Sequence, residues 1–519
     1  MLGLRLAPVL VVAATLALYA PIVGHDFVTW DDPEFVYANP RLFPATAAGL
    51  ARVWVEPNAL TNTVYVALSM LPAPASGNVD PRAVHVTSLV LHGAAALAAW
   101  ALLVQLVHDP TVAAAGALLF ALHPVQVEPV AWATGLKDVL SGLFGLLALG
   151  AWVRAAPDGR SRVLAAGTGW LVLALLAKPT AVVVPIMAAV LDRTLLGRGW
   201  RTSLRALVSW LIVSLVFAAL VVHGQAEALR DAPPLWARPL VAVDALAFYV
   251  RLLVAPIALG PDYGRTPAVV LAAGWPYAVG LAVAASVLLV LVRRARRPWL
   301  TASVGLFVAG LLPVLGLTPF LFQRYSTVAD RYCYLALLGP ALAVATLLAR
   351  HRRPATLALA AVVLAALAVR SAVQLRVWRD STTLLEHGVR VNPASWALYE
   401  NLGSVLAGQR QAERALVAYS ESIRLRPENP SVHYNLGTVL LEQGRADDAI
   451  AAWSETLRLD PGFVLAHHNL GSVLAQRGQV DEAEAHFQDA ARLAPEFAPA
   501  RQALREIEAW RRSRAAGAP

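Results

Sequence analysis

Ionisable side chains stand in short stretches between long apolar runs of this sequence. In the first stretch Asp31 and Asp32 are neighbours. Two carboxylates beside a membrane span are costly unless water solvates them or they take part in chemistry. A carboxylate in such a place can act as a general base that deprotonates an attacking hydroxyl group. Taken alone, the pair is read more simply as a solvated loop, or as a cap for a helix that begins at Pro33.

Three later stretches mix acids with cations in the same way. They hold His123, Glu128, Lys137 and Asp138, then Lys178, and then Arg324 and Arg331. Lys178 and Arg331 lie in segments otherwise poor in cations, where a cation beside a membrane helix often has a fixed anionic partner. That partner is either a neighbouring Asp or Glu or the phosphate of a lipid, and the sequence leaves both open.

The composition divides the chain into two regions with different solvents. Of the 519 residues, 58% are hydrophobic and only 15% are charged, whereas soluble domains have about 25% charged residues. Residues 1–375 are mostly long apolar runs, and residues 376–519 have the composition of a soluble protein. The net charge of +9 comes with arginines clustered between apolar runs, as in membrane-protein loops, so nucleic-acid binding is discounted.

The apolar runs predict a polytopic helical membrane domain of about eleven spans. The first is a retained signal anchor at 4–23. The later spans are expected near 84–107, 111–122, 138–153, 163–177, 180–192, 206–222, 266–292, 299–318, 332–349 and 354–373. A further apolar segment, 239–258, does not fit this count and is interpreted as a re-entrant or interfacial helix.

Clusters of arginine predict the orientation of these spans. The clusters are Arg154, Arg160 and Arg162; Arg193, Arg198, Arg201 and Arg205; Arg293, Arg294, Arg296 and Arg297; and Arg350, Arg352 and Arg353. The positive-inside rule places all four in the cytoplasm, together with the N-terminus. Segments 24–83, 123–137, the surroundings of 178, 223–265, 319–331 and everything after about 374 then face outward. We therefore expect a multi-pass protein of the cell inner membrane with a periplasmic or extracytoplasmic C-terminal region.

The C-terminal region repeats every 34 residues. The equivalent positions are Leu402-Gly403, Leu436-Gly437 and Leu470-Gly471; Ala415, Ala449 and Ala483; Tyr419, Trp453 and Phe487; and Pro427, Pro461 and Pro495. This is the pattern of tetratricopeptide repeats (TPRs), in which pairs of helices stack into an α-solenoid. It predicts a linker and half repeat at 376–395, three repeats at 396–497, and a capping helix with a tail at 498–519. A binding groove would be lined by Tyr399, Asn401, Tyr434, Asn435, His468 and Asn469, although these side chains can equally serve packing.

Taken in order, the motifs of the apolar region resemble those of the transmembrane-and-TPR O-mannosyltransferase family, in the GT-C glycosyltransferase superfamily. The resemblance rests on Phe27-Val28-Thr29-Trp30-Asp31-Asp32, Asn39-Pro40, His85, His92, His123-Pro124, Glu128, Gly135, Asp138, Lys178, Asp330-Arg331-Tyr332-Cys333-Tyr334-Leu335 and Trp378-Arg379-Asp380. The sequence departs from the family at Thr61-Asn62-Thr63-Val64-Tyr65, where an Arg-Pro-Leu-Thr-like motif is usual, and at Lys178-Pro179, where the family has Lys-Glu.

The resemblance implies an inverting transfer of mannose or another hexose from a polyprenyl-phosphate donor to a protein hydroxyl group on the non-cytoplasmic face. Asp31 would be the general base, with Asp32 positioning the acceptor or sharing that role. The donor phosphate would be held by Arg331, Lys178, Arg324 and Lys137, and the site would be shaped by His123, Glu128 and Asp138. The TPR region would present a protein acceptor. A monophosphate donor carries less charge than a diphosphate and no metal-binding cluster stands out, so no metal and no cofactor beyond the lipid-linked sugar is expected. Cys333 is the only cysteine, which leaves no intramolecular disulfide.

Three other functions stay open. In a non-enzymatic TPR scaffold for envelope or protein assembly, Asp31 and Asp32 would point to solvent, far from Lys178 and Arg331. A lipid-linked oligosaccharide ligase or polymerase usually has a long late outward loop, whereas 319–331 is short. A transporter would carry its charged residues at mid-span, whereas here they gather at one face.

Overall fold

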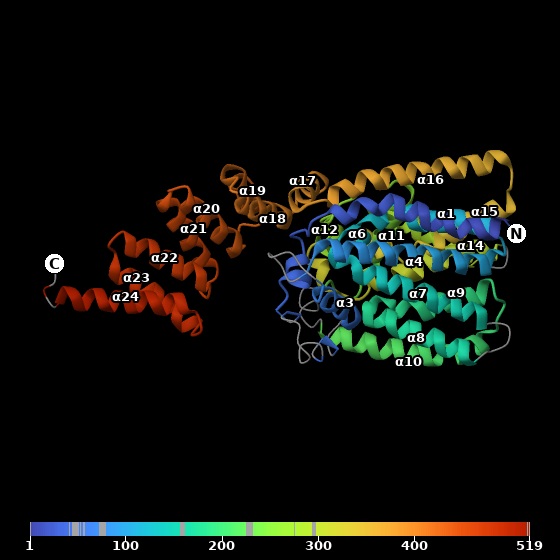
Figure 1. The fold of residues 1–519 in the computed structure, drawn as a ribbon, viewed down its shortest axis with the longest axis horizontal. Helices are drawn as coiled ribbons and strands as arrows, with labels where there is room; N and C mark the ends of the chain where they lie inside the picture. The colour runs from blue at the N-terminus through green and yellow to red at the C-terminus, as the bar shows by residue number, and fades with distance from the viewer. Residues whose placement is uncertain are drawn as a thin grey trace. The chain divides into compact units, whose positions relative to one another are not determined.

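The computed structural model describes residues 2–40, 42–43, 51, 53–54, 58–71, 79–155, 161–224, 232–273, 276–292, 297–515 and 517. Throughout these residues the regular structure is helical and no strand occurs, as the predicted all-α fold requires. The chain forms two compact units, Met1–Asn392 and Pro393–Pro519. Figure 1 traces both.

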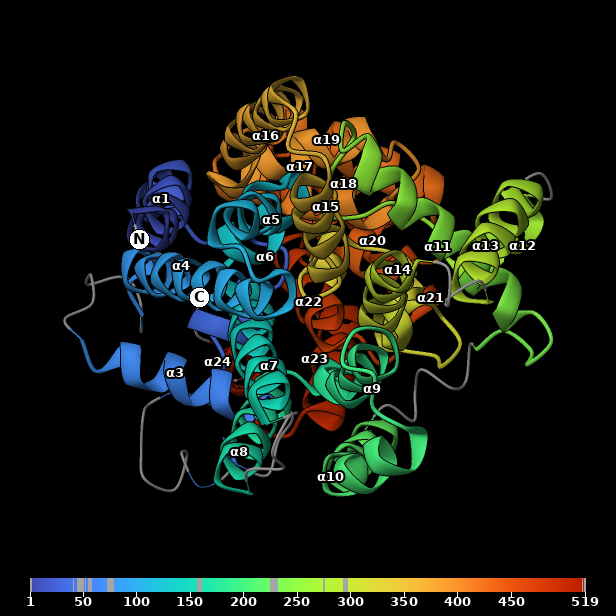
Figure 2. The ribbon, with the colours of Figure 1, turned by 90° about the vertical axis from the view of Figure 1, so that its right-hand side faces the viewer.

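The first unit is a bundle of helices that run side by side, as the end-on view of Figure 2 shows. Its long helices are α1 (Leu2–Tyr19), α4 (Pro81–Val107), α5 (Pro110–Leu122), α7 (Leu136–Ala155), α8 (Ser161–Ala177), α9 (Val184–Thr194), α10 (Trp200–Gly224), α11 (Arg238–Val254), α13 (Pro276–Val292), α14 (Pro298–Leu311), α15 (Leu338–Arg350) and α16 (Pro354–Leu375). Shorter ones are α3 (Ala59–Ser69), α6 (Val127–Ala131), α12 (Pro267–Ala272) and α17 (Ser381–Val391).

In this bundle α4 packs on both α5 and α7, and α15 packs on α5. Small residues allow the close approach. A Cβ atom added at Gly116 of α5 would lie 2.5 Å from the carbonyl oxygen of Ala341 on α15. The outer helices are different, because only 6% of the apolar window of α16 is buried within the chain. Its exposed side chains, including Leu359, Val362 and Val369, are aliphatic.

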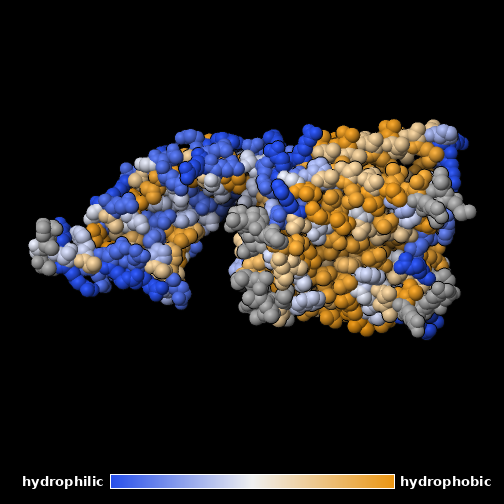
Figure 3. All heavy atoms as spheres, viewed as in Figure 1, coloured by the Kyte–Doolittle hydropathy of each residue, from blue (hydrophilic) through white to orange (hydrophobic). Residues whose placement is uncertain are grey.

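Several helices are apolar enough to cross a membrane. Among the described residues, five are both long and apolar enough: Leu6–Gly24, Pro81–Val107, Ala133–Ala155, Trp200–Leu220 and Pro354–Trp378. The pair Pro110–Leu122 and Pro124–Ala131, bent by 52°, would make a sixth. Shorter apolar helices cover Val163–Ala177, Gly280–Val290, Pro298–Val314 and Leu338–Arg350. Figure 3 shows apolar side chains over the flank of the bundle, with polar side chains gathered towards its ends. The predicted number of spans, and the interfacial role of 239–258, stay predictions.

The N-terminus, the α9–α10 connection and the α15–α16 connection all lie at one end of the bundle, at the right in Figure 1. The last two carry predicted cytoplasmic arginines. Asp192 holds the α9–α10 connection in place, because its carboxylate accepts hydrogen bonds from the Trp152 indole (3.0 Å) and from Arg198 (3.3 Å). Arg160, Arg293, Arg294 and Arg296 lie outside the described residues.

The second unit consists of paired helices with the predicted period. Its helices are α18 (Trp396–Gly408), α19 (Ala412–Leu425), α20 (Pro430–Glu442), α21 (Ala446–Leu459), α22 (Val464–Gln476), α23 (Val480–Leu493) and the capping helix α24 (Ala498–Ala515). In each pair an aromatic ring of the second helix packs against the glycine of the first. A Cβ atom at Gly437 would lie 2.6 Å from the Trp453 indole, so only glycine fits there.

The boundary between the units differs from the expected one. The predicted membrane domain ended at 375 and was followed by a half repeat, but α17 groups with the first unit. Side-chain hydrogen bonds hold it there. His387 Nε2 lies 2.7 Å from the carbonyl oxygen of Leu259, and the Ser381 hydroxyl accepts from the amide of Thr29 at 2.9 Å. The half repeat is therefore a part of the first unit, which ends at Asn392.

Candidate functional site

Asp32 is an anchor for the first predicted outward loop. Its side chain is 1% exposed. The carboxylate accepts from the Val28 amide (2.9 Å), the Thr134 amide (2.9 Å) and the Thr134 hydroxyl (2.7 Å). Burial raises the pKa of Asp32 to about 6, although these hydrogen bonds act in the opposite direction. Asp32 therefore joins the loop before Pro33 to the turn after α6, and its oxygens are already occupied.

Asp31 has no such hydrogen-bond partner for its carboxylate among the residues that the structure describes. It is only partly exposed, and burial raises its pKa. Lys137 and Arg331 are near enough to lower that pKa in part. The structure thus brings Asp31 close to two of the cations that the sequence grouped with it, and it leaves the carboxylate oxygens available.

Glu128 and Arg331 form a buried ion pair at the centre of this group. Their side chains are 2% and 5% exposed, and the Glu128 carboxylate accepts from both the guanidinium and, at 2.8 Å, the backbone amide of Arg331. The guanidinium lies 4.3 Å from the ring centre of Phe322 and about 5 Å from those of Tyr332 and Trp132. Arg331 is therefore held in one orientation, with Glu128 as its counter-ion.

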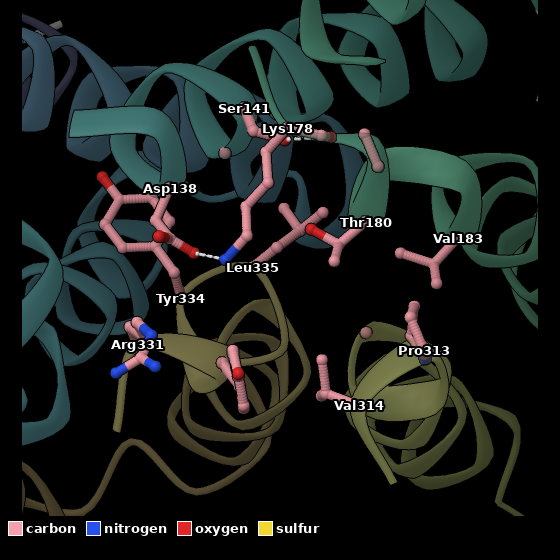
Figure 4. Close-up of a pocket in the computed structure, with 14 residues that line it drawn as sticks. Asp138, Ser141, Lys178, Thr180, Val183, Pro313, Val314, Arg331, Tyr334 and Leu335 are labelled. Carbon is pink, nitrogen blue, oxygen red and sulfur yellow. Dashed lines mark hydrogen bonds and ion pairs between the residues drawn. The ribbon is translucent and has the colours of Figure 1, made fainter. Parts of the chain in front are cut away.

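Asp138 and Lys178 form a second ion pair, 2.5 Å between carboxylate oxygen and Nζ, at the mouth of a small cavity. Figure 4 shows the pair, from α7 and from the α8–α9 connection, with Arg331 and Tyr334 among the other residues that line the cavity. The Lys178 Nζ also lies 5.3 Å from the ring centre of Tyr332. The cavity measures about 40 Å³, room for water but not for a sugar.

Of the remaining predicted site residues, some lie within this group of charges and others do not. The Lys137 Nζ lies 5.3 Å from the ring centre of Phe35 and 5.9 Å from that of Trp132, within the same group of charges. Arg324 is exposed on the short helix before Tyr325. His123 is not in the group. Its Nε2 donates to the carbonyl of Leu253 (3.1 Å), and its Nδ1 accepts from the Val125 amide (3.4 Å), so it caps a turn.

The arrangement can therefore hold an anion and can accept a proton. Asp31 offers a carboxylate without a hydrogen-bond donor among the described residues, and Lys137 and Arg331 bring positive charge to it. Among the described residues, no three His, Cys, Asp or Glu side chains are placed to hold one metal ion.

Helix α3 contributes Thr61 and Tyr65 to this region, and their contacts here were not predicted from the sequence. The Tyr65 hydroxyl donates to the carbonyl of Ala133 (2.7 Å), and the Thr61 hydroxyl donates to that of Ala177 (3.1 Å). These carbonyls directly precede Thr134 and Lys178 in the chain, so one face of α3 fixes both turns. The signal in the sequence was two polar side chains four residues apart in an apolar segment, which share a helix face.

In the second unit, the predicted groove residues are partly used for packing. Asn469 donates to the Tyr434 hydroxyl (3.2 Å), and Asn401 donates to the carbonyl of Ala397 in its own helix (2.8 Å). Tyr399 and Asn435 are half-buried. His468 lines a cavity of about 640 Å³ between α22 and α24. This volume lies in the range of ligand-binding clefts.

Comparisons with known proteins identify the repeats. The family model described as "Tetratricopeptide repeat" matches residues 434–496, and the one described as "TPR repeat" matches residues 403–444. No curated protein matches the chain.

Similar solved structures cover only a part of the chain. A crystal structure of MamA is 28% identical and covers 22% of this chain and 68% of its own, with a TM-score of 0.22. The first TPR of Spaghetti (RPAP3), bound to the HSP90 peptide SRMEEVD, is 18% identical and covers 22% and 90%, with a TM-score of 0.21. PilF of Pseudomonas aeruginosa is 22% identical and covers 27% and 61%, with a TM-score of 0.24.

Proposed function

We propose that this chain is a membrane-embedded protein that holds a protein partner through its TPR unit. The observation that carries this proposal is the stack of three repeats closed by α24, which leaves a cavity of ligand size at its capped end. Such stacks create extended concave surfaces for binding other proteins. The apolar helices of the first unit would keep that surface at the membrane.

Photo-cross-linking in native membranes tests the recruitment. A cross-linking side chain at Ser472, which lines the cavity, should capture a partner, and an excess of soluble fragment 393–519 should compete for it. The matched control is Ser454, which is exposed on the second helix of its repeat. Equal yields from Ser472 and Ser454, or no competition by the fragment, would exclude recruitment through the groove.

A second candidate function is glycosyl transfer by the first unit, and the unpaired carboxylate of Asp31 beside Lys137 and Arg331 favours it. An acceptor hydroxyl oxygen would form a bond to the anomeric carbon of the sugar while the bond from that carbon to the phosphate oxygen breaks. Asp31 would take the hydroxyl proton, and the polyprenyl phosphate would leave with the bonding electrons. The nearby cations would stabilise its charge.

Among these cations, Lys137 is the best placed to meet the phosphate. Arg331 is already paired with Glu128, and Lys178 with Asp138, whereas Lys137 has no ion pair among the described residues. A sugar does not fit the 40 Å³ cavity between α7 and the turn at Arg331. Neither Asp31 nor Lys137 lines that cavity, so the donor would bind beside it and not within it.

The transfer assay uses the full chain in membranes, a radiolabelled polyprenyl-phosphate mannose and an acceptor protein. We expect label to pass to protein, and Lys137→Ala to raise the KM for the donor more than it lowers kcat, because it removes a phosphate contact. Arg82→Ala, an exposed cation outside the group, is the control. Background transfer by the unaltered chain with every donor sugar tried would count against this candidate function.

A further inference from the structure

The cavity in the TPR unit lies between the first helix of the third repeat and the capping helix. It is lined by His468, Ser472, Ala475, Val480, Phe487, Pro499, Gln502, Ala503, Glu506, Ile507 and Trp510. Most of the wall is apolar, and Glu506 is the one residue in it with a full charge at neutral pH. None of the lining residues is Lys or Arg. A bound segment would therefore meet an apolar surface with a single carboxylate.

The absence of cations extends along all the first helices of the repeats. Helices α18, α20 and α22 contain no Lys or Arg, and their charged side chains are Glu400 and Glu442. The second helices α19, α21 and α23 instead carry acids and arginines together. In a chain with a net charge of +9, this series of first helices is electronegative, which favours a partner of the opposite sign.

The carboxylate of Glu506 is free to receive a cation. It accepts one hydrogen bond, from Gln502 at 2.9 Å, and it has no ion pair among the described residues. Two nearby arginines are committed elsewhere. Arg511 pairs with Asp481 (2.5 Å) and Glu484 (2.7 Å), and Arg512 pairs with Glu508 (2.9 Å).

The aromatic side chains suit the long stem of a basic residue. Lys and Arg bury their methylene groups on apolar surface while the charged head stays in a polar place. One face of the Trp510 ring holds the Arg514 guanidinium, 4.8 Å from the ring centre, so an incoming stem would lie on the part of this ring that stays exposed. His468 stands between Phe487 and Phe497, and its Nδ1 has no partner in the described part of the chain.

We propose that this cavity is the anchor site for a Lys or Arg side chain of an extended, basic segment of the protein partner. The stem would lie against Phe487 and Trp510 with its charged head at Glu506. This inference rests on the proposed recruitment function and specifies the chemistry of the partner. It disfavours an acidic segment, because the first helices α18, α20 and α22 offer no cation to pair with one.

Binding of defined peptides to the full chain in non-ionic detergent tests the inference. Three fluorescein-labelled ten-residue peptides share one sequence except at two central positions, which are Lys-Arg, Gln-Gln or Glu-Glu. Fluorescence anisotropy should show the Lys-Arg peptide binding about tenfold more tightly than the Gln-Gln peptide, with an affinity that falls as salt rises. Glu506→Gln should weaken the Lys-Arg peptide about fivefold, the size of one partly exposed ion pair, and should leave the Gln-Gln peptide unchanged.

Glu508→Gln is the matched control, since Glu508 is exposed on the same helix and is paired with Arg512. It should leave the binding of all three peptides unchanged. Equal affinities for the Lys-Arg and Gln-Gln peptides, or equal effects of Glu506→Gln and Glu508→Gln, would overturn the basic anchor while recruitment through the groove survives. If none of the peptides binds while Ser472 still cross-links a partner, the basic anchor is also wrong. If no peptide binds and Ser472 also captures no partner, the recruitment function is wrong as well.

Discussion

At the scale of single residues, the two neighbouring aspartates have different environments and should respond differently to the same change. Asp31→Asn keeps the shape of the side chain but removes the ability to accept a proton. We expect it to lower sugar transfer by roughly 100-fold, the low end of general-base effects, with an unchanged melting temperature. Asp26→Asn, an exposed change in the same loop, is the control. Full transfer by Asp31→Asn would remove the carboxylate mechanism.

Asp32→Asn should instead lower stability. The carboxylate accepts from two backbone amides and one hydroxyl, and an asparagine would turn its NH2 group towards at least one of these donors. Leaving a buried donor unsatisfied costs about 1–3 kcal/mol. Thermal unfolding in detergent should show the loss. A melting temperature equal to that of the unaltered protein would contradict the anchoring role of Asp32.

The buried and the exposed ion pairs of the first unit offer a second contrast. Glu128→Ala leaves the Arg331 guanidinium buried without its counter-ion, which should cost about 3–5 kcal/mol. Arg352→Ala breaks an ion pair with Asp109 in which the arginine is 61% exposed, and should cost about 1 kcal/mol or less. The two variants are compared by chemical unfolding in one detergent. Similar losses would mean that Arg331 finds another partner.

At the scale of elements, the second unit should fold by itself when it begins at Pro393. The compact unit starts there, and α17 before it buries Leu384 and Leu385 in the first unit. A fragment 393–519 should therefore be helical and monomeric, whereas 380–519 should self-associate through the uncovered face of α17. Circular dichroism and gel filtration compare the two fragments. A disordered 393–519 would contradict the autonomy of the repeats.

A histidine pair should make this fragment less stable in acid. The Nδ1 atoms of His467 on α22 and His486 on α23 lie 3.0 Å apart, and His467 Nε2 donates to the carbonyl of Pro461. His486 must then donate, and His467 accept. Burial lowers the pKa of His486, and His467 lowers it further, although Asp489 and Glu482 oppose this. The folded state thus binds its proton less readily than the unfolded state.

The stability that depends on neutral His486 is present above its unfolded pKa of about 6.5 and is lost as the pH falls below it. The melting temperature of 393–519 should decrease from pH 7.5 to pH 5.5. His486→Gln should flatten this dependence, while His433→Gln, on the same unit, should not. Parallel pH profiles for all three proteins would show that the pair is not responsible.

The sequence predicted the helices of the repeats well, because the residue type at each repeated position indicates how the two helices of a pair pack. The Leu-Gly and aromatic columns fixed the TPR pairs, because a Cβ atom at Gly437 would collide with Trp453. The sequence also brought Asp31, Lys137 and Arg331 into one group. It gave Asp32 a part in positioning the acceptor and did not predict its hydrogen bonds to Thr134, because Thr134 is 102 residues away. The hydrogen bond of His123 to the carbonyl of Leu253, 130 residues away, could not be predicted for the same reason.

At the scale of the whole molecule, glycosyl transfer to a protein held by the repeats requires one orientation in the membrane. The repeats, the Asp31 loop and the turn at Lys178 must share the non-cytoplasmic side, and the arginine-rich connections must face the cytoplasm. The N-terminus and two arginine-bearing connections lie together at one end of the first unit (Figure 1). This grouping agrees with the predicted orientation of the bundle.

Cysteine labelling measures that orientation directly. The one cysteine, Cys333, is buried and is first replaced by Ala. Single cysteines then follow at Glu34 in the first loop, Gly199 in the α9–α10 connection and Gly408 at the end of α18. A side chain at either glycine meets open space. With a membrane-impermeant maleimide on spheroplasts, Glu34→Cys and Gly408→Cys should be labelled at once, and Gly199→Cys only after permeabilisation. Labelling of Gly199→Cys and Gly408→Cys from the same side would contradict the proposed orientation, and with it the glycosyl-transfer candidate.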